Sequence, residues 1–365
     1  MVKKFLSLVF LAVVIYACSS NEGEDDPIFI DDFDRGLMLT NLADNIIIPS
    51  YEDFATNMTL MKNAGQTFTA TPTQNTLDLF RSSWLDAYKS WQRVEMFNIG
   101  KAEELQYSFY MNVYPLTVSD VQNNVINGGY DLNNVNNQDA QGFPALDYLL
   151  HGISDNDADL LAVFTSGQNA TEYSNYVNAI LNQMNGLTQE VLTHWKGSFR
   201  STFINSKSNT ATSSLNKLVN DFIFYYEKGL RANKFGIPAG VFSGSALPEK
   251  VEGYYNKNIS KQLALEAFQA IKTFYIGNGG VSLSQYIDDV SSDGYADLST
   301  DILDQFDIAE SLINGLDNNF YNQIITDNNK VLETYDAIQQ GTILLKTDML
   351  SVLQIATDYV DADGD

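Results

Sequence analysis

The chain has 365 residues, of which 21 are Lys or Arg and 46 are Asp or Glu, so its formal net charge is −25. Nucleic-acid binding depends on cationic side chains that neutralise phosphates, and this acidity argues against a nucleic-acid partner. A single cysteine excludes an internal disulfide and a Cys-based zinc site, and two histidines leave little for a His-rich metal centre. The hydrophobic content of 44% indicates a folded chain with a sizeable core.

The N-terminus has the layout of a bacterial lipoprotein signal peptide. Lys3 and Lys4 precede an apolar run at 5–15, which is too short for a comfortable bilayer span, and a small residue stands just before Cys18. This pattern predicts removal of residues 1–17 and acylation of Cys18, and therefore a lipid anchor that holds the protein at a membrane of the cell envelope. The alternative is an ordinary cleaved signal with an incidental cysteine.

Residues 18–35 are predicted to form a flexible acidic tether. The stretch 19–27 is small and acidic, and no apolar residue follows Cys18 until Ile28. Acidic stretches directly after a lipid-bearing cysteine resemble export signals that send some Gram-negative lipoproteins to the outer face of the outer membrane. A solvated spacer explains the composition equally well, so the face of anchoring, periplasmic or surface, stays open.

Apolar residues beyond residue 30 recur in steps of three or four, the spacing of helices with one buried face. At Thr71-Pro72-Thr73-Gln74, a Thr cap followed by Pro and then Gln is typical of a helix start. The apolar face of the helix that follows carries Leu77, Phe80, Trp84, Tyr88 and Trp91. Helices are predicted at 36–64, 73–98, 101–113, 143–151, 171–200, 211–234, 259–275, 297–316, 328–345 and 347–358.

Strand signatures are scarce, because alternating β-branched runs bounded by hairpin turns are missing. We therefore predict an all-α protein of two helical-bundle domains, 36–200 and 201–365, divided at the Ser/Asn/Thr-rich stretch 201–214. Long loops are expected at 119–141 and 236–253. The first is rich in Asn and Gly, and it is either a functional loop or a disordered insertion.

Several motifs follow one another along nearly the whole mature chain. They are an opening helix that ends in Ile-Pro-Ser-Tyr (38–51), an aromatic helix that closes on Glu-x-Phe-x-x-Gly (84–100), an aromatic-Pro-Leu turn (114–116), a segment that begins Gly-Phe-Pro-Ala-Leu-Asp (142–152), Lys-Phe-Gly-Ile-Pro (234–238) and an acidic run (361–365). In this order they resemble the imelysin-like family of bacterial iron-regulated envelope proteins. The resemblance implies two helical bundles related by duplication, a site near their junction and a context in iron acquisition, although the founding member was described as a metallopeptidase.

The chain departs from the family at its signature, Gly-x-His-x-x-Glu. The corresponding positions here are Gly142, Pro144 and Asp147. Proline has no side-chain donor atom and cannot bind a metal. Asp147 keeps the carboxylate but is one methylene shorter than Glu, which moves its oxygens by about 1.5 Å. We therefore expect a degenerate metal site.

Glu95 is the first candidate site residue. It follows Trp91 by four residues and so places a carboxylate on the buried face of the aromatic helix, where an ionised group needs a partner or a metal. It also matches the family's Glu-x-Phe. A role in the site and a plain ion pair with Arg93 or Lys101 are both open interpretations.

Asp147 and His151 are spaced i, i+4 and so share one face of a short helix. One interpretation is a relocated carboxylate and imidazole pair that replaces the lost signature histidine and, with Glu95, binds iron or another divalent metal. The other is a hydrogen bond at the helix end, where a His151 cation just before Gly152 would suit the helix dipole.

Alternating acids at 155–159 and 361–365 resemble the start of a calcium loop, but both runs lack the Glu that would close it. Solvated acidic turns are the simpler interpretation. Patterns for a zinc protease helix, a nucleophile elbow, a phosphate-binding loop or a dinucleotide fold are missing.

These observations predict an envelope lipoprotein that serves as a non-catalytic component of iron or haem-iron uptake, with an envelope transport protein as a partner. Two alternatives stay open. One is a metallopeptidase that uses Glu95, Asp147 and His151, for which a single nearby imidazole makes the common zinc arrangements hard to build. The other is an interaction module whose aromatic junction groove binds a protein or peptide.

Overall fold

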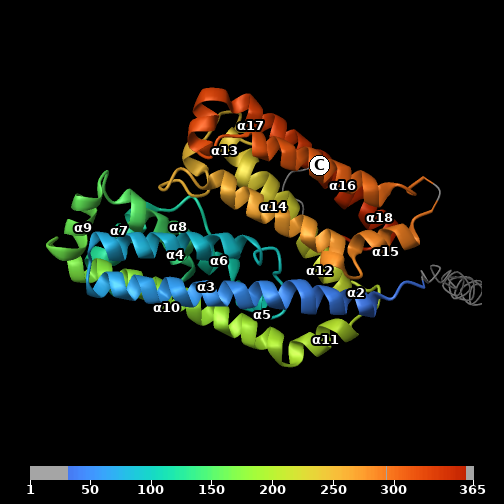
Figure 1. Cartoon of the computed structure of the whole chain (residues 1–365), viewed down its shortest axis with the longest axis horizontal. Helices are drawn as coiled ribbons and strands as arrows, with labels where there is room; N and C mark the ends of the chain where they lie inside the picture. Colours follow the sequence, from blue (N-terminus) through green and yellow to red (C-terminus); the bar gives the residue numbers. More distant parts are fainter. Residues whose placement is uncertain (1–31, 293, 359–365) are drawn as a thin grey trace, which may run out of the picture. The chain divides into compact units, whose positions relative to one another are not determined.

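Helices make up every regular element in the computed structural model, which describes residues 32–292 and 294–358 (Figure 1). The all-α prediction is confirmed for this part of the chain. The predicted signal peptide, Cys18 and most of the predicted tether lie outside the described residues. Among the helices that are described, none combines the length and apolar character needed to cross a membrane.

The first helix set runs from α2 to α11. Its long members are α2 (Arg35–Leu42) continued by η1 (Ala43–Ile47) and α3 (Ile48–Ala70), then α4 (Gln74–Gln92), and α10 (Ala170–His194) continued by η4 (Trp195–Phe199) and α11 (Arg200–Asn205). Shorter helices between them are α5 (Lys101–Glu104), α6 (Ser108–Met111), α7 (Val118–Asn127), η2 (Val135–Ala140), α8 (Gly142–Asp147), η3 (Tyr148–Gly152) and α9 (Asp157–Thr165). Helix α3 packs against both α4 and α10, and these three helices form the core of the set.

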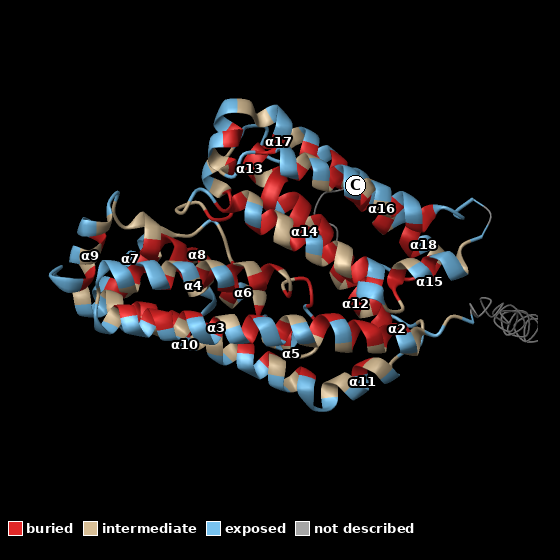
Figure 2. Cartoon of the chain, in the orientation of Figure 1, coloured by how far each residue is buried: buried red, intermediate tan, exposed pale blue. Residues whose placement is uncertain are grey.

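The second helix set follows residue 213. It contains α12 (Ser214–Phe224), η5 (Tyr225–Gly236), α13 (Ile237–Ala239), η6 (Pro248–Lys250), α14 (Ser260–Ile276), η7 (Gly277–Gly279), α15 (Leu283–Val290), α16 (Leu298–Gly315), α17 (Phe320–Ile343), η8 (Leu344–Met349) and α18 (Leu350–Leu353). Helix α17 packs against α16 and η5, and α14 packs against α16 and η5. Buried residues lie along the faces that these helices turn toward one another (Figure 2).

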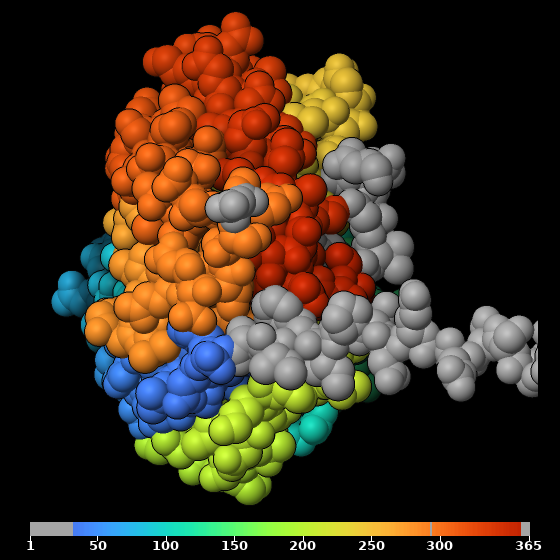
Figure 3. Space-filling model, turned by 90° about the vertical axis from the view of Figure 1, so that its right-hand side faces the viewer, coloured from blue at the N-terminus to red at the C-terminus, as the bar shows by residue number. Residues whose placement is uncertain are grey.

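The two helix sets pack against each other. Helix α14 of the second set lies on α4 of the first. Near the N-terminal end, α2 lies beside α11 and also contacts the second set (Figure 3). This second contact is with η7, where Asn41 Nδ2 donates to the Gly277 carbonyl at 2.7 Å. The described residues from Asp34 onward cluster as one compact unit. The boundary predicted at 201–214 falls between α11 and α12, and the division into two domains stays a prediction.

The start, the buried face and the end of helix α4 follow from its local sequence. Its cap is Thr73, whose side chain accepts from the Thr76 amide in a capping box, so the predicted cap at Thr71 was two residues early. The predicted apolar face is confirmed, because its five members are buried. Arg93 closes the helix, and the chain then turns through Glu95 toward α5.

Several short helices were not predicted. The loop expected at 119–141 contains α7 and η2, the acidic turn at 155–159 opens α9, and α15 lies in a stretch with no predicted helix. Each is short, so its apolar residues repeat over too few turns to give a clear helical period, and local caps mark the starts of α9 and α15. Asn156 caps α9, and Ser282 forms a capping box with Gln285 at the start of α15.

Candidate functional site

A buried polar network joins the two helix sets beside the end of α4. Lys234 of η5 and Glu252, which follows η6, are each only 2% exposed and form an ion pair. Lys234 Nζ also donates to Gln92 Oε1 at 2.7 Å, and Gln92 Nε2 donates to Glu252 Oε1 at 2.9 Å. These three side chains therefore close a ring of hydrogen bonds that ties α4 to η5 and to the segment after η6.

Asn112, at the end of α6, connects this ring to Glu95. Its Nδ2 donates to Glu252 Oε1 at 2.8 Å and to Glu95 Oε1 at 3.1 Å, and its Oδ1 accepts from the Tyr88 hydroxyl at 2.7 Å. The Tyr225 hydroxyl donates to Glu95 Oε2 at 3.0 Å. Each oxygen of Glu95 thus accepts one hydrogen bond from a fixed neighbour. The junction network is the set Gln92, Glu95, Asn112, Tyr225, Lys234 and Glu252.

The junction network contains two carboxylates and one ammonium group. Burial raises the pKa of Glu95, the nearby Lys234 lowers it, and the charge of Glu252 raises it again. Burial together with the charges of Glu252 and Glu95 raises the pKa of Tyr88 and Tyr225 well above the usual value, so both hydroxyls stay protonated and can donate. The single ammonium group of Lys234 can balance only one of the two carboxylates, Glu95 and Glu252.

Glu95 faces a pocket between the two helix sets with a volume of about 320 Å³. The first set contributes residues from 95–98 and 108–114, and the second set contributes residues from α12 and η5. Four aromatic side chains line it, namely Phe109, Tyr114, Phe224 and Tyr225, and the charged side chains of its lining are Glu95, Asp221 and Lys228. We call this the junction pocket. Its carboxylate, amide and aromatic groups can bind a small organic ligand.

The signature segment, 142–152, contacts residues 255 and 256, which follow Glu252 in the chain. Gly142 has a φ of +73°, and a Cβ at this position would overlap the carbonyl oxygen of Met111, so only glycine fits. Pro144 is buried in the first turn of α8. Asp147 is 2% exposed, and its two oxygens accept from the backbone amides of Tyr255 at 2.9 Å and Asn256 at 3.0 Å.

Asp147 and His151 are joined through Asn256 and not directly. The amide Nδ2 of Asn256 lies 3.2 Å from His151 Nε2, and the imidazole packs 5.3 Å from the Trp84 ring. Burial and the positive charge of Arg81 lower the pKa of His151 to about 4, so the ring is neutral near pH 7. Burial raises the pKa of Asp147 to about 7, against the effect of its two amide donors. The expected cation at the helix end is therefore wrong, whereas a hydrogen bond of His151 is observed.

The predicted metal ligands do not gather in one place. Glu95 belongs to the junction network, whereas Asp147 and His151 contact the segment at 255–256. Within 32–292 and 294–358, no three His, Cys, Asp or Glu side chains form a group that could hold a metal ion. The alternative ion pair of Glu95 is also wrong, because Arg93 pairs with Asp53 and Glu266, and Lys101 pairs with Glu104.

The acidic runs have a simple explanation where the structure describes them. Asp157 lies in the first turn of α9 and pairs with Arg81 at 2.7 Å, and Asp159 accepts from the cap residue Asn156. The run at 361–365 lies outside the described residues. His194, the second histidine, stacks on Phe199 with ring centroids 4.5 Å apart.

Sequence reasoning missed Gln92, Asn112, Lys234 and Glu252 as parts of the site. Lys234 lies in a motif that supports the resemblance, but its role depends on Glu252, which comes from a distant loop. The sequence feature that could have pointed to Glu252 is the predicted loop at 236–253, because a long connection that contains Gly and Pro is often functional.

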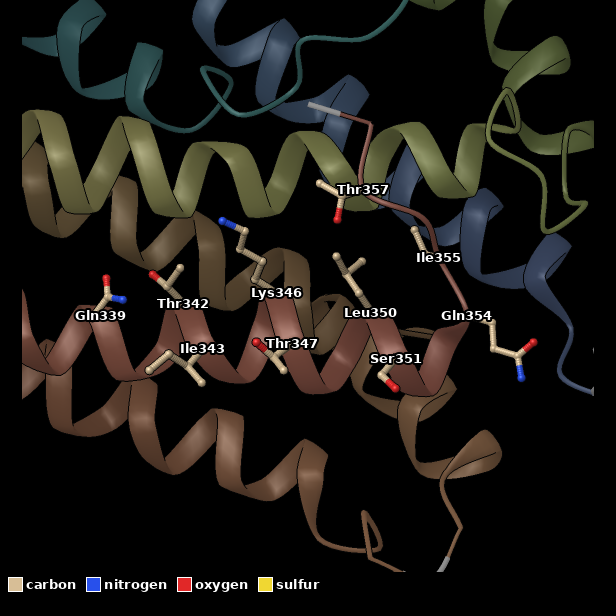
Figure 4. Close-up of a pocket in the computed structure, with 10 residues that line it drawn as sticks. All are labelled: Gln339, Thr342, Ile343, Lys346, Thr347, Leu350, Ser351, Gln354, Ile355 and Thr357. Atoms are coloured by element: carbon tan, nitrogen blue, oxygen red, sulfur yellow. The ribbon is translucent and has the colours of Figure 1, made fainter. Parts of the chain in front are cut away.

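A larger pocket, of about 830 Å³, lies along η8 and α18 (Figure 4). Its lining is mostly Thr, Ser, Gln and aliphatic side chains, with Lys346 as the one charged group among the lining residues that the structure describes. Lys346 points across to η5, where its Nζ lies 3.4 Å from Glu227. This pocket contains none of the predicted site residues.

The fold and site together define an all-α protein whose two helix sets enclose a pocket with a buried polar network. The Imelysin family model (Peptidase_M75) matches residues 47–346. Because this match covers most of the chain, the protein belongs to the imelysin family.

Two solved structures share the fold. An imelysin-like protein from Psychrobacter arcticum has a TM-score of 0.66 and 17% identity, covering 91% of this chain and 99% of that one. A putative iron-regulated protein A precursor from Parabacteroides distasonis has a TM-score of 0.71 and 18% identity, covering 89% and 97%. An iron-regulated protein A from Synechococcus elongatus is 28% identical over 78 residues, which are 21% of this chain and 22% of that protein. The aligned region spans about a fifth of that relative.

Proposed function

We propose that this protein is a lipid-anchored component of iron or haem-iron uptake in the cell envelope, and that it binds its cargo in the junction pocket without transforming it. The observation that carries the proposal is the position of Glu95, a carboxylate with both oxygens held by fixed donors at the base of a pocket formed by both helix sets. A preorganised group in a pocket between two packed units is a usual arrangement for binding a small ligand.

Membership of the imelysin family supports the iron context, since the relatives described above include proteins named as iron-regulated. The arrangement of the acids favours binding over catalysis. Glu252 is neutralised by Lys234 in a closed ring, and Asp147 is occupied by two backbone amides, so neither is placed to act on a bound substrate.

The anchor is proposed from Cys18 and the apolar run that precedes it. Metabolic labelling with a fatty acid tests it directly. Label on the wild-type protein that disappears in Cys18→Ala is the expected result. Label that persists in Cys18→Ala, or a wild-type protein without label, contradicts the anchor.

Equilibrium binding tests the cargo. The purified protein is titrated with ferric citrate, ferrous iron, zinc and haem, and binding is followed by calorimetry and absorbance. We expect one iron species or haem to bind at near-unit ratio. Failure of every iron species and of haem to bind contradicts the proposed function.

A further inference from the structure

The junction pocket differs from a metal site in the kind of groups it offers. Glu95 is the acid at its base, and each of its oxygens already accepts one hydrogen bond. A carboxylate oxygen has a second lone pair, so Glu95 can accept one more donor on the side that faces the pocket. The other lining acid, Asp221, interacts with Lys217, Glu103 and Asp358.

The charge balance favours a cation. Lys234 pairs with Glu252 and can balance only one of the two carboxylates, so a cation that approaches Glu95 would favour its ionised form against the effect of burial. The lining cation, Lys228, lies 3.7 Å from the buried Glu227. A positively charged group that enters the pocket would therefore supply the charge that the junction network lacks.

The walls favour an organic ligand. Phe109 from the first helix set and Phe224 from the second both line the pocket while remaining 47% and 45% exposed. Tyr114 and Tyr225 add two further rings. Aromatic faces attract cations and also bury the apolar body of a ligand, so a carboxylate surrounded by four rings suits a cation with an attached hydrocarbon frame.

We propose that the junction pocket recognises an organic cation, whose protonated amine approaches Glu95 and whose apolar or aromatic body contacts Phe109 and Phe224. This proposal rests on the proposed function, because it takes the junction pocket as the cargo site. It adds that iron enters as part of an organic complex and not as a bare ion. The cationic nitrogen of the complex, and not the metal, meets the carboxylate of the protein.

Three probes of nearly equal size test the charge preference. The purified protein is titrated at pH 7 and low salt with benzylamine, benzyl alcohol and benzoate, and binding is followed by ligand-observed NMR. We expect benzylamine, which is protonated at this pH, to bind about tenfold more tightly than benzyl alcohol, the effect of one charge-assisted hydrogen bond. Benzoate should bind more weakly than either. Equal binding of the three probes, or tighter binding of benzoate, overturns the proposal.

Variants show whether the preference for benzylamine depends on Glu95. Glu95→Gln keeps the shape of the side chain and should reduce benzylamine binding to the level of benzyl alcohol. Glu172→Gln, on the exposed side of α10, removes the same charge elsewhere and should change nothing. If Glu95→Gln fails to fold, Phe109→Ala at the exposed wall replaces it, and there we expect benzylamine binding to weaken by about threefold to tenfold. Unchanged benzylamine binding in the folded variant contradicts the proposal.

The probe titrations and the cargo titrations distinguish a wrong ligand class from a wrong proposed function. If haem or ferric citrate binds but the probes show no preference for the cation, the proposed function stands and the ligand class is wrong. If benzylamine binds at Glu95 while no iron species and no haem binds, the ligand class stands and the iron role is wrong. If neither group of ligands binds, both are wrong.

Discussion

Glu95 of the junction network and Asp147 of the signature segment both accept hydrogen bonds on their two carboxylate oxygens, but from different kinds of donor. Glu95 accepts hydrogen bonds from two side chains and still faces a pocket, whereas both oxygens of Asp147 are occupied by backbone amides. Only two residues separate Glu252, in the network, from Tyr255, whose amide donates to Asp147. One loop therefore serves both regions: its first part belongs to the junction network, and its second part holds Asp147.

This difference explains how the chain keeps the architecture of the imelysin family with an altered signature. Pro144 occupies the first turn of α8, where proline is tolerated because the amide it lacks has no partner within the helix. Asp147 holds the loop in place. The signature segment thus positions the loop that carries Glu252, while Glu95 lines the junction pocket.

The largest expected effect comes from breaking the junction network. In Lys234→Met, Glu252 stays buried without its cation, and we expect the free energy of unfolding to fall by about 3–5 kcal/mol. Urea denaturation measures the change. The double variant Lys234→Met, Glu252→Gln removes the stranded charge and should recover part of the loss. A single variant that loses less than about 1 kcal/mol would show that the network is not closed as described.

A substitution at Gly142 disrupts the signature segment without changing a residue of the junction network. In Gly142→Ala, the new Cβ meets the Met111 carbonyl and the residue keeps an unfavourable positive φ, so we expect a loss of about 2–3 kcal/mol in thermal or urea unfolding. Gly128→Ala is the matched control, since Gly128 has a φ of +61° and open space around it. Equal losses in the two variants would contradict the close approach at Gly142.

A smaller effect on stability is expected from Asp221, an acid in the wall of the junction pocket. Burial, followed by the charges of Asp358 and Glu103, raises the pKa of Asp221 to about 8, against the opposing effect of Lys217. A carboxyl whose pKa is higher in the folded state, against about 3.9 when unfolded, stabilises the fold at low pH and loses that contribution as pH rises toward 8.

In Asp221→Asn the side chain cannot ionise. Relative to wild type, its free energy of unfolding should therefore rise by about 1–2 kcal/mol between pH 4.5 and 8.5, a figure that allows for solvent screening at a half-buried site. Denaturation at the two pH values measures it, and Asp86→Asn on the exposed side of α4 corrects for the loss of one negative charge. A difference that does not depend on pH would contradict the raised pKa of Asp221.

The helical fold was largely predictable because long helices repeat their apolar residues many times, as α4 does from Leu77 to Trp91. Short helices such as α7 and α9 repeat them too few times to be distinguished from loops. Within the site, Glu95 was predictable as a carboxylate on a buried face. Its hydrogen-bond partners were not, because Asn112 and Tyr225 reach it only when α6 and η5 pack around the end of α4.

The central claim is that Glu95, and not the histidine of the signature segment, holds the ligand. The direct measurement is equilibrium binding of benzylamine to the wild-type protein, to Glu95→Gln and to His151→Gln, which keeps a polar group near Asn256. We predict that Glu95→Gln weakens binding by about tenfold or more, the worth of one charged hydrogen bond, and that His151→Gln changes it by less than about twofold. Loss of binding in His151→Gln together with full binding in Glu95→Gln would contradict the account.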